Sequence, residues 1–315
     1  MRKVLTAASR AGELAVAQTE IVIAAVRKVH PDIEIRIKEV TTGGDRDRQT
    51  ALWDLKSSGF FTSQVEEALT AGQADFAVHS FKDLPTESRA GLVVAAVLDR
   101  RFVEDCVIAA EPVESIEQLA GSAKVGTSSL RRAAQLKHLR PDLEAAAIRG
   151  NVPTRIRKLA AGDFDAIILA RAGLERLGLG ERISFCLEPT EFLPAAAQGA
   201  LAVQTRADDT ETSKLIGAID DKNARTAALA ERRVLAAMRA GCHAPVGAFA
   251  RIRRESITIC AFISDVQGLN YIRRELTGPV EQAEGLAERI AEQLLGAGGQ
   301  EILDKLTNNR QTTLP

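Results

Sequence analysis

In the first two thirds of the chain, hydrophobic and polar positions alternate with two periods, one typical of strands and one of helices. Between residues 33 and 37, isoleucine alternates with charged side chains, which is typical of a half-buried strand. Leu14, Ala17 and Ile21 follow helical spacing instead. The same patterns predict strands at 4–7, 76–78, 124–127 and 165–170 and helices through 65–69, 130–139 and 152–160. This alternation of strand and helix predicts mainly parallel sheets with helices on both faces.

Parts of this pattern repeat. Ala-Gly-Gln-Ala-Asp at 71–75 precedes one predicted strand, and Ala-Gly-Asp-Phe-Asp at 161–165 leads into another. The segment 4–10 likewise resembles the segment 125–131. We therefore expect two similar α/β domains that face one cleft. Ligands of such sheets bind at the carboxyl ends of the strands.

The last third of the chain has a different order of elements. A long helix pattern at 223–239 comes first. Three strand patterns and two helix patterns follow, with the strands at 246–252, 257–263 and 269–274 and the helices at 280–295 and 300–306. Consecutive strands followed by helices predict a small α+β domain with an antiparallel sheet.

The composition narrows the possible functions. Of the 315 residues, 45% are hydrophobic and 26% charged, and 41 basic residues against 42 acidic ones give a formal net charge of −1. This balance argues against a general nucleic-acid binder, as does an aromatic content of only 4%. The apolar runs are too short for a membrane span, and we expect no secretory segment at the N-terminus. Four cysteines without metal-ligand or disulfide spacing indicate reduced thiols and a cytoplasmic location.

A polar turn follows the predicted strand at 76–78. It carries a base, a hydroxyl, a cation and a carboxylate, namely His79, Ser80, Lys82 and Asp83. A solvated turn with the carboxylate as a local cap explains this pattern about as well as a catalytic site does. In a catalytic site, Asp83 could act as a general acid or base, or it could stabilise a cation. His79 alone is more typical of a hydrogen-bonded structural residue.

Hydroxyl and guanidinium groups gather where the helix at 130–139 begins. The group consists of Thr127, Ser128, Ser129, Arg131 and Arg132. Backbone N–H groups and the helix dipole favour an anion at such a position, and these side chains suit a carboxylate or a phosphate. An N-cap serine beside a solvated arginine pair is the simpler alternative, but it explains the coincidence less well.

Further arginines lie at predicted strand ends. They are Arg10, Arg149, Arg155 and Arg176. Arg157 and Lys158, by contrast, most simply form a solvated helix face. Several arginines around one cleft, on a nearly neutral chain, predict a small polyanionic ligand.

One cysteine stands apart from the other three. Cys242 lies between Gly241 and a nearby proline, after the long helix, so we expect it on a loop where its thiol can react. Burial as a small hydrophobe is the better interpretation for Cys106, Cys186 and Cys260.

These segments together are recognisable. The sequence resembles the hydroxymethylbilane synthase family, also called porphobilinogen deaminases, in order from about residue 4 to the C-terminus. The segments that carry the resemblance are 82–85, 125–132, 149–155, 165–178, 194–206 and 241–247. The runs at 125–132 and 149–152 are highly specific.

The resemblance implies an α/β fold of three domains. Two resemble type II periplasmic binding proteins and face a common cleft, and a third, small α+β domain carries the cofactor thiol. We expect domain 1 at 1–98 plus 199–218, domain 2 at 104–194 and domain 3 at 222–315. We expect this protein to be a cytoplasmic monomer without a nucleic-acid or membrane partner and without a metal.

The resemblance also implies roles for individual residues. Cys242 would hold a dipyrromethane cofactor through a thioether, and Asp83 would be the central catalytic carboxylate. The cofactor and substrate would be bound by Arg10, Ser80, Lys82, Thr127, Ser128, Ser129, Arg131, Arg132, Arg149, Arg155, Arg176 and Gln198. The implied reaction deaminates four molecules of porphobilinogen, joins them head to tail and releases a linear tetrapyrrole.

The sequence departs from the family pattern at three places. Gly12 replaces a serine after Arg10, Gly43 stands where arginine is common, and Ser58 stands where lysine usually precedes the glycine at 59. These changes predict altered affinity before altered activity. A non-catalytic binding protein for small anions, using the same two-domain cleft, is the rival interpretation, and an impaired relative of the family is a third. A binding protein needs no covalent adduct on Cys242.

Overall fold

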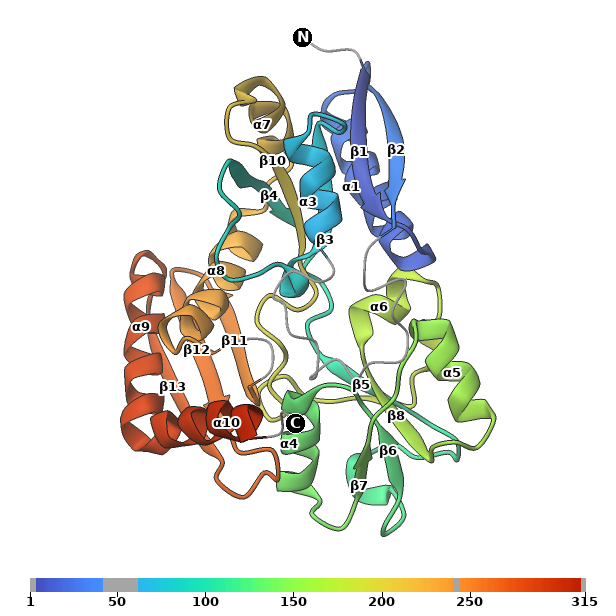
Figure 1. The fold of residues 1–315 in the computed structure, drawn as a ribbon, viewed down its shortest axis with the longest axis vertical. Helices are drawn as coiled ribbons and strands as arrows, with labels where there is room; N and C mark the ends of the chain where they lie inside the picture. The colour runs from blue at the N-terminus through green and yellow to red at the C-terminus, as the bar shows by residue number, and fades with distance from the viewer. Residues whose placement is uncertain (1–3, 42–61, 241–243, 313–315) are drawn as a thin grey trace.

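The computed structural model describes residues 4–41, 62–240 and 244–312. In these ranges the strands form three sheets, which Figure 1 shows as separate bodies around a common centre. The first sheet has the order β2-β1-β3-β10-β4. Its strands are β1 (Val4–Arg10), β2 (Glu34–Val40), β3 (Phe76–Ser80), β4 (Leu92–Leu98) and β10 (Leu201–Arg206). Its helices are α1 (Glu13–Val29), α3 (Ser63–Thr70) and α7 (Thr210–Gly217).

The second sheet has the equivalent order, β7-β6-β8-β5-β9. Its strands are β5 (Asp105–Ala109), β6 (Lys124–Gly126), β7 (Glu144–Ala146), β8 (Ala166–Ala170) and β9 (Phe185–Cys186). Its helices are α4 (Leu130–Leu139), α5 (Val152–Ala160) and α6 (Arg171–Arg176). In each sheet, one strand runs antiparallel to its two neighbours, β10 in the first and β5 in the second. Four of the five strands in each sheet therefore run in the predicted common direction, whereas the two pairings of the reversed strand are antiparallel.

The sequence repeat corresponds to a repeated contact. In the first sheet, the backbone N–H of Thr6 donates to Asp75 Oδ2 at 2.7 Å. In the second, the backbone N–H of Lys124 donates to Asp165 Oδ2 at 2.6 Å. Each aspartate therefore ties the turn before a central strand to the start of the neighbouring strand, and the two α/β units are built alike.

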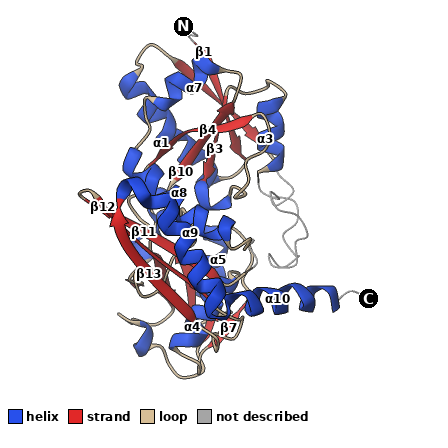
Figure 2. Ribbon diagram, turned by 90° about the vertical axis from the view of Figure 1, so that its left-hand side faces the viewer, coloured by secondary structure: helices blue, strands red, loops and turns tan. Residues whose placement is uncertain are grey.

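The third sheet is antiparallel, with the order β11-β12-β13. Its strands are β11 (Val246–Arg253), β12 (Ser256–Ile263) and β13 (Ile272–Pro279), and the helices of this part are α8 (Lys222–Ala237), α9 (Ala283–Leu294) and α10 (Gln300–Thr312). Helices α8 and α9 lie side by side against the sheet, as the two views in Figures 1 and 2 agree. The fold class expected from the sequence, two similar α/β units and a small α+β unit, is confirmed, whereas the domain boundaries given above stay a prediction.

The third strand of this sheet was predicted wrongly. The sequence pattern placed it at 269–274, but β13 begins at Ile272 and continues to Pro279. The carboxylate of Asp265 accepts hydrogen bonds from the backbone N–H groups of Gln267, Leu269 and Asn270. This turn holds the chain out of the sheet up to Asn270, so Leu269 is 80% exposed rather than part of a strand.

Two segments carry the chain between the first and second sheets. The chain leaves the first sheet after β4 and returns to it at β10, so β10 joins strands that lie far earlier in the sequence. The two segments meet where Gly199 lies against Phe102. Gly199 has a φ of +86°, and a Cβ built on it would lie 2.3 Å from the Phe102 carbonyl oxygen. Only glycine fits here.

Gly199→Ala is therefore expected to lower the free energy of unfolding by about 1–3 kcal/mol or more, from backbone strain together with the clash. Thermal unfolding measures the effect. Gly285→Ala is the matched control, because Gly285 lies in α9 at ordinary φ with nothing within 4 Å of a built Cβ. Equal melting temperatures for the two variants would contradict this account of the crossing.

In the described ranges, no helix is long and apolar enough to cross a membrane.

Candidate functional site

A cleft of about 830 Å³ lies between the first and second sheets. The carboxyl ends of β1, β3 and β8 reach it with Arg10, Ser80 and Ala170. The first turns of α1 and α5 also line it, so two helix N-termini contribute to its walls. Strand ends and helix N-termini are the positions where α/β sheets bind ligands, and helix N-termini favour anions. The position of the cleft agrees with the expectation from the repeat.

Positive side chains dominate the walls of the cleft. The cations that line it are Arg10, Lys82, Arg132, Arg149, Arg155, Lys158 and Arg176. The carboxylates that line it are Glu13 and Asp83. Among the described residues, seven cations against two carboxylates, on a chain with a formal net charge of −1, make this a site for an anion with several negative groups.

Burial and the repulsion between neighbouring cations lower the pKa values of basic side chains in the cleft. Burial lowers the pKa of Arg155 to about 10, and the neighbouring charges of Arg132 and Arg149 act in the same direction. Burial also lowers the pKa of Lys82 to about 8, which Asp83 opposes and Arg132 reinforces. A bound anion would relieve this repulsion.

Asp83 ends a short 3₁₀ turn, Phe81–Asp83, directly after β3. The Phe81 side chain is buried and anchors the turn, whereas Asp83 is exposed to the cleft. From behind, Arg232 of α8 donates hydrogen bonds to the backbone oxygens of Phe81 and Leu84 at 3.2 and 2.8 Å. A rigid turn therefore presents the carboxylate to the cleft.

Ser80 and His79 precede this turn. Ser80 lines the cleft and accepts a hydrogen bond from Gln18 Nε2 of α1 at 2.8 Å. His79 is buried, and burial, together with the charge of Arg10, lowers its pKa to about 4. The imidazole is therefore neutral near pH 7 and adds no positive charge to the cleft.

The hydroxyl groups before α4 mainly hold the loop. Thr127 Oγ1 accepts a hydrogen bond from the Ser129 backbone N–H at 3.2 Å, Ser128 donates to the Ile148 carbonyl, and Ser129 caps α4. None of these three lines the cleft. The N-cap interpretation of Ser129 is confirmed.

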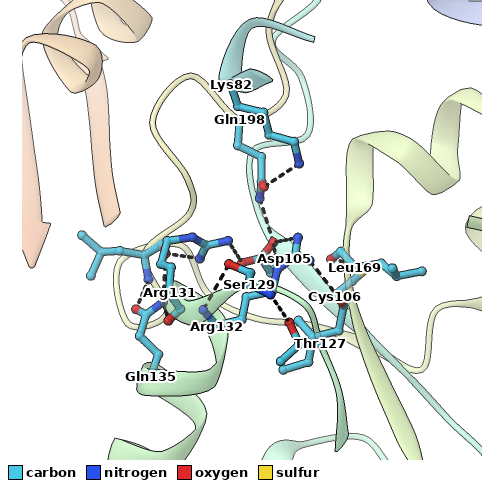
Figure 3. Close-up of polar contacts among 12 residues, drawn as sticks. Lys82, Asp105, Cys106, Thr127, Ser129, Arg131, Arg132, Gln135, Leu169 and Gln198 are labelled. Atoms are coloured by element: carbon cyan, nitrogen blue, oxygen red, sulfur yellow. Dashed lines mark hydrogen bonds and ion pairs between the residues drawn. The ribbon is translucent and has the colours of Figure 1, made fainter. Parts of the chain in front are cut away.

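Arg131 and Arg132 point into a buried cluster rather than to solvent. Figure 3 shows both side chains turned toward Asp105, with Gln198 and Lys82 above them. Arg132 Nη2 lies 2.7 Å from Asp105 Oδ1, and Arg131 Nη2 lies 2.8 Å from Oδ2. Of the pair, only Arg132 lines the cleft. The alternative of a solvated arginine pair is wrong, because both side chains are buried and ion-paired.

The remaining candidate arginines lie on the walls contributed by the second sheet. Arg149 lines the cleft just before α5, and Arg155 donates to the Gly150 carbonyl at 2.8 Å. Arg176, at the end of α6, forms an ion pair with Asp99 at 3.1 Å and donates to the Gly199 carbonyl. Arg176 therefore connects the second α/β unit to both segments that run between the first and second sheets, through Asp99 on one and Gly199 on the other.

The prediction of a solvated helix face holds for Arg157 but not for Lys158. Arg157 is exposed on α5 and does not line the cleft, as expected. Lys158 was predicted to be solvated in the same way but is partly buried and lines the cleft. Successive residues of a helix point about 100° apart. Lys158 therefore faces the cleft, while its neighbour Arg157 faces solvent.

Asp105 is the important residue that the sequence pattern did not single out. It begins an apolar strand and has no exposed surface. A carboxylate at the head of an apolar run signals a buried partner, but the partners lie 26 and 27 positions later, so no local spacing connects them. Burial alone would raise the pKa of Asp105, but Arg131 and Arg132 outweigh this and hold it well below its usual value.

Cys242, Gly43 and Ser58 lie outside the described residues. Gly12 is described and is the N-cap residue before α1, where no side chain caps the helix. The other three cysteines are free thiols, and Cys106 and Cys260 are buried as predicted. The prediction of burial is wrong for Cys186, which is exposed because it lies on β9, the short strand at the edge of the second sheet. Burial raises the pKa of each thiol, that of Cys260 to about 11. In the described ranges, no group of three or more His, Cys, Asp or Glu side chains could hold a metal ion.

Known proteins resemble this chain over most of its length. Residues 5–214 match the family described as "Porphobilinogen deaminase, dipyromethane cofactor binding domain", and residues 225–296 match "Porphobilinogen deaminase, C-terminal domain". Porphobilinogen deaminase of Roseiflexus castenholzii is 42% identical over 303 residues, which are 96% of this chain and 99% of that protein. The enzyme of the same name from Desulforudis audaxviator is 41% identical over 306 residues, 97% of this chain and 99% of that protein.

Solved structures give weaker similarities. A YaeC-family lipoprotein of Enterococcus faecalis is 19% identical, with a TM-score of 0.44 over 71% of this chain and 93% of that one. The methionine-binding protein MetQ is 12% identical, with a TM-score of 0.42 over 69% of this chain and 89% of that one. The family matches, by contrast, cover both the α/β units and the third domain. The chain therefore belongs to the porphobilinogen deaminase family.

Proposed function

We propose that this chain is a hydroxymethylbilane synthase, a transferase that deaminates four porphobilinogen molecules, joins them head to tail and releases the linear tetrapyrrole hydroxymethylbilane. The observation that carries the proposal is the cleft with seven cations, in a chain of the porphobilinogen deaminase family. The test is to incubate the purified protein with porphobilinogen and measure ammonia release and tetrapyrrole formation. Tight binding of porphobilinogen without release of ammonia would instead favour the non-catalytic binding protein.

The residues of the cleft fit the dipyrromethane cofactor of this family. Each of its two pyrroles carries an acetate and a propionate group, and the described cleft has more cations than carboxylates. Burial and neighbouring cations lower the pKa values of Lys82 and Arg155, and a bound carboxylate would stabilise the protonated form of both side chains. Arg132 and Arg155, with Lys82, are therefore the residues we assign to the carboxylates of the cofactor. When bound, the cofactor supplies a nucleophilic pyrrole carbon.

Attachment of this cofactor is assigned to Cys242. The other cysteines support the assignment, because none of them lines the cleft and burial raises the pKa of each thiol. A thiol with a raised pKa forms little thiolate near neutral pH and is a poor nucleophile. Cys242 follows α8, the helix whose Arg232 braces the turn that carries Asp83.

Asp83 is assigned the catalytic role. Deamination and coupling of pyrroles pass through cationic states, and an oriented carboxylate stabilises such charge most when it is already in place. The cations around the cleft cannot do this, because like charge would oppose the reaction. Asp83 lines the cleft on a turn that Arg232 braces, whereas Glu13 belongs to the first turn of α1.

The other candidate residues receive supporting roles. Arg10, Ser80, Arg149 and Arg176 line the cleft and are assigned to the carboxylates of incoming and growing pyrroles. Thr127, Ser128, Ser129, Arg131 and Gln198 are assigned to the wall behind them. The growing chain gains two carboxylates with each pyrrole, which accounts for cations spread over the whole cleft rather than gathered at one point. We further propose that the protein acts as a monomer in the cytoplasm.

Arg149→Leu is expected to raise the KM for porphobilinogen by about tenfold to a hundredfold, because a charge-assisted contact to a carboxylate is worth about 1.5–3 kcal/mol. Steady-state kinetics measure the effect. Arg157→Leu is the matched control, because Arg157 lies nearby on α5 but outside the cleft, and its KM should match the wild-type value. Equal KM values for the two variants would remove Arg149 from the substrate site.

A further inference from the structure

Asp105 contacts three side chains from two other parts of the chain, the start of α4 and the segment before β10. Its Oδ1 accepts hydrogen bonds from Arg132 Nε at 3.1 Å and Nη2 at 2.7 Å, and its Oδ2 forms the ion pair with Arg131. Gln198 Nε2 donates to Oδ1 at 2.9 Å. Asp105 does not line the cleft, whereas Arg132 does. Any effect of Asp105 on the cleft must therefore pass through its neighbours.

The arginine pair needs a carboxylate at this position. Arg131 and Arg132 occupy the first turn of α4, the positive end of the helix, and that turn contains no acidic residue. Two buried guanidiniums without a counter-charge would be costly. Asp105 stays ionised beside them and reduces the charge of the group from +2 to +1.

Asp105 also fixes how Arg132 is presented. A guanidinium has five N–H donors. Arg132 uses two of them on Asp105 and a third on the Ile168 carbonyl at 3.1 Å. The side chain is thereby held at three points, and its other two N–H donors have no hydrogen-bond partner among the residues that the structure describes.

The same carboxylate is linked to the other side of the cleft. Gln198 uses its amide nitrogen on Asp105, so its Oε1 is turned toward Lys82 and accepts a hydrogen bond from Nζ at 3.2 Å. Figure 3 shows this line of contacts running from Lys82 through Gln198 to Asp105. Lys82 follows β3 of the first sheet, and Asp105 begins β5 of the second.

We propose that Asp105 is a positioning residue, which orients Arg132 directly and Lys82 through Gln198 so that cations from both α/β units converge on the carboxylates in the cleft. The proposal rests on the proposed function, in which Arg132 and Lys82 bind the carboxylates of the cofactor. It assigns to Asp105 no contact with the cofactor or the substrate.

Three variants test the role. Asp105→Asn removes the charge at nearly constant shape, and Asp105→Glu keeps the charge. Glu231→Gln is the matched control, because Glu231 is also fully buried and paired with an arginine, Arg100, but that arginine, unlike Arg132, does not line the cleft. Thermal unfolding reports folding, intact mass reports the fraction of protein that carries the cofactor, and KM and kcat are measured against pH.

Asp105→Asn is expected to reduce the cofactor-loaded fraction about tenfold or more, since charge-assisted hydrogen bonds are lost. Its KM should also begin to rise at a pH about one unit lower than in the wild type. The reason is that burial lowers the pKa of Lys82 to about 8, Arg131 and Arg132 add to this shift, and Asp83 and Asp105 oppose it. Lys82 would therefore lose its proton, and its hold on a carboxylate, at lower pH.

Asp105→Glu should restore the wild-type pH dependence, and Glu231→Gln should lower the melting temperature without changing cofactor loading or pH dependence. If Asp105→Asn does not fold, Asp105→Asn combined with Arg131→Met restores the net charge of +1. This double variant should fold and still load poorly, because Arg132 has lost its anchor. Normal loading in either folded variant, or an equal loading defect in Glu231→Gln, would overturn the proposal.

Failure of the proposed function gives a different result. A wild-type protein without a pyrrole adduct and without ammonia release would refute that function before any variant is compared. A wild-type protein that is loaded and active, beside an Asp105→Asn variant equal to it, would refute the positioning role alone.

Discussion

Asp83→Asn is expected to fold and to carry its cofactor, but to turn over porphobilinogen about 10²–10³-fold more slowly than the wild type. Asparagine keeps the shape of the side chain and removes the negative charge, and loss of one oriented electrostatic contact costs about 3–4 kcal/mol in the transition state. Because Asp83 is exposed, its replacement should change the free energy of unfolding by only about 0.5 kcal/mol or less.

The rate of ammonia release at saturating porphobilinogen measures this effect. Glu87→Gln is the matched control, because Glu87 is an exposed carboxylate four positions later that does not line the cleft, and its rate should be unchanged. Near-normal turnover by a folded, cofactor-loaded Asp83→Asn protein would show that another group stabilises the cationic states. Glu13, the other carboxylate among the described residues that line the cleft, would then be the residue to replace next.

Cys242→Ser is expected to yield protein without the pyrrole adduct and without tetrapyrrole synthesis. A serine hydroxyl is a far weaker nucleophile than a cysteine thiol near neutral pH, so the thioether should not form. Intact mass of the purified variant, followed by the assay with porphobilinogen, measures both effects. The activity loss should be complete, since no other cysteine offers an equivalent thiol in the cleft.

Cys186→Ser provides the control for this variant. Cys186 is an exposed free thiol on β9, outside the cleft, and burial of part of the side chain raises its pKa. We expect Cys186→Ser to carry the adduct and to work at the wild-type rate. An adduct that persists in Cys242→Ser and disappears in Cys186→Ser would reverse the assignment.

The fold could be predicted wherever short-range signals decide the structure. The bounds of α4 and α5 agree with the expected helices, because Ser129 and Asn151 cap them and Pro153 stands in the first turn of α5. Strand β13 could not be placed, since the turn around Asp265 depends on several hydrogen bonds that leave no periodic pattern. Strand β10 pairs with β3 and β4 across more than a hundred residues, and no local pattern carries that information.

Some residues of the candidate site could likewise be located from local patterns, whereas others depend on partners far away in the sequence. Strand ends placed Arg10 and Ser80 at the cleft, together with Arg149, because parallel strands bring their carboxyl ends to one edge. The sequence did not reveal that Arg131 is turned away from the cleft or that Asp105 balances it, since both depend on partners from another strand. A pattern along the chain identifies which residues are chemically capable, and only the fold decides which of them face the ligand.

The most direct test of the whole account is the intact mass of the purified wild-type protein before and after limited addition of porphobilinogen. We expect a protein heavier than its sequence by two linked pyrrole units, and then a ladder of species that are heavier by one to four further pyrroles. The ladder should collapse back to the starting mass as the tetrapyrrole is released. A protein at the mass of its sequence, with no ladder and no loss of porphobilinogen, would contradict the account.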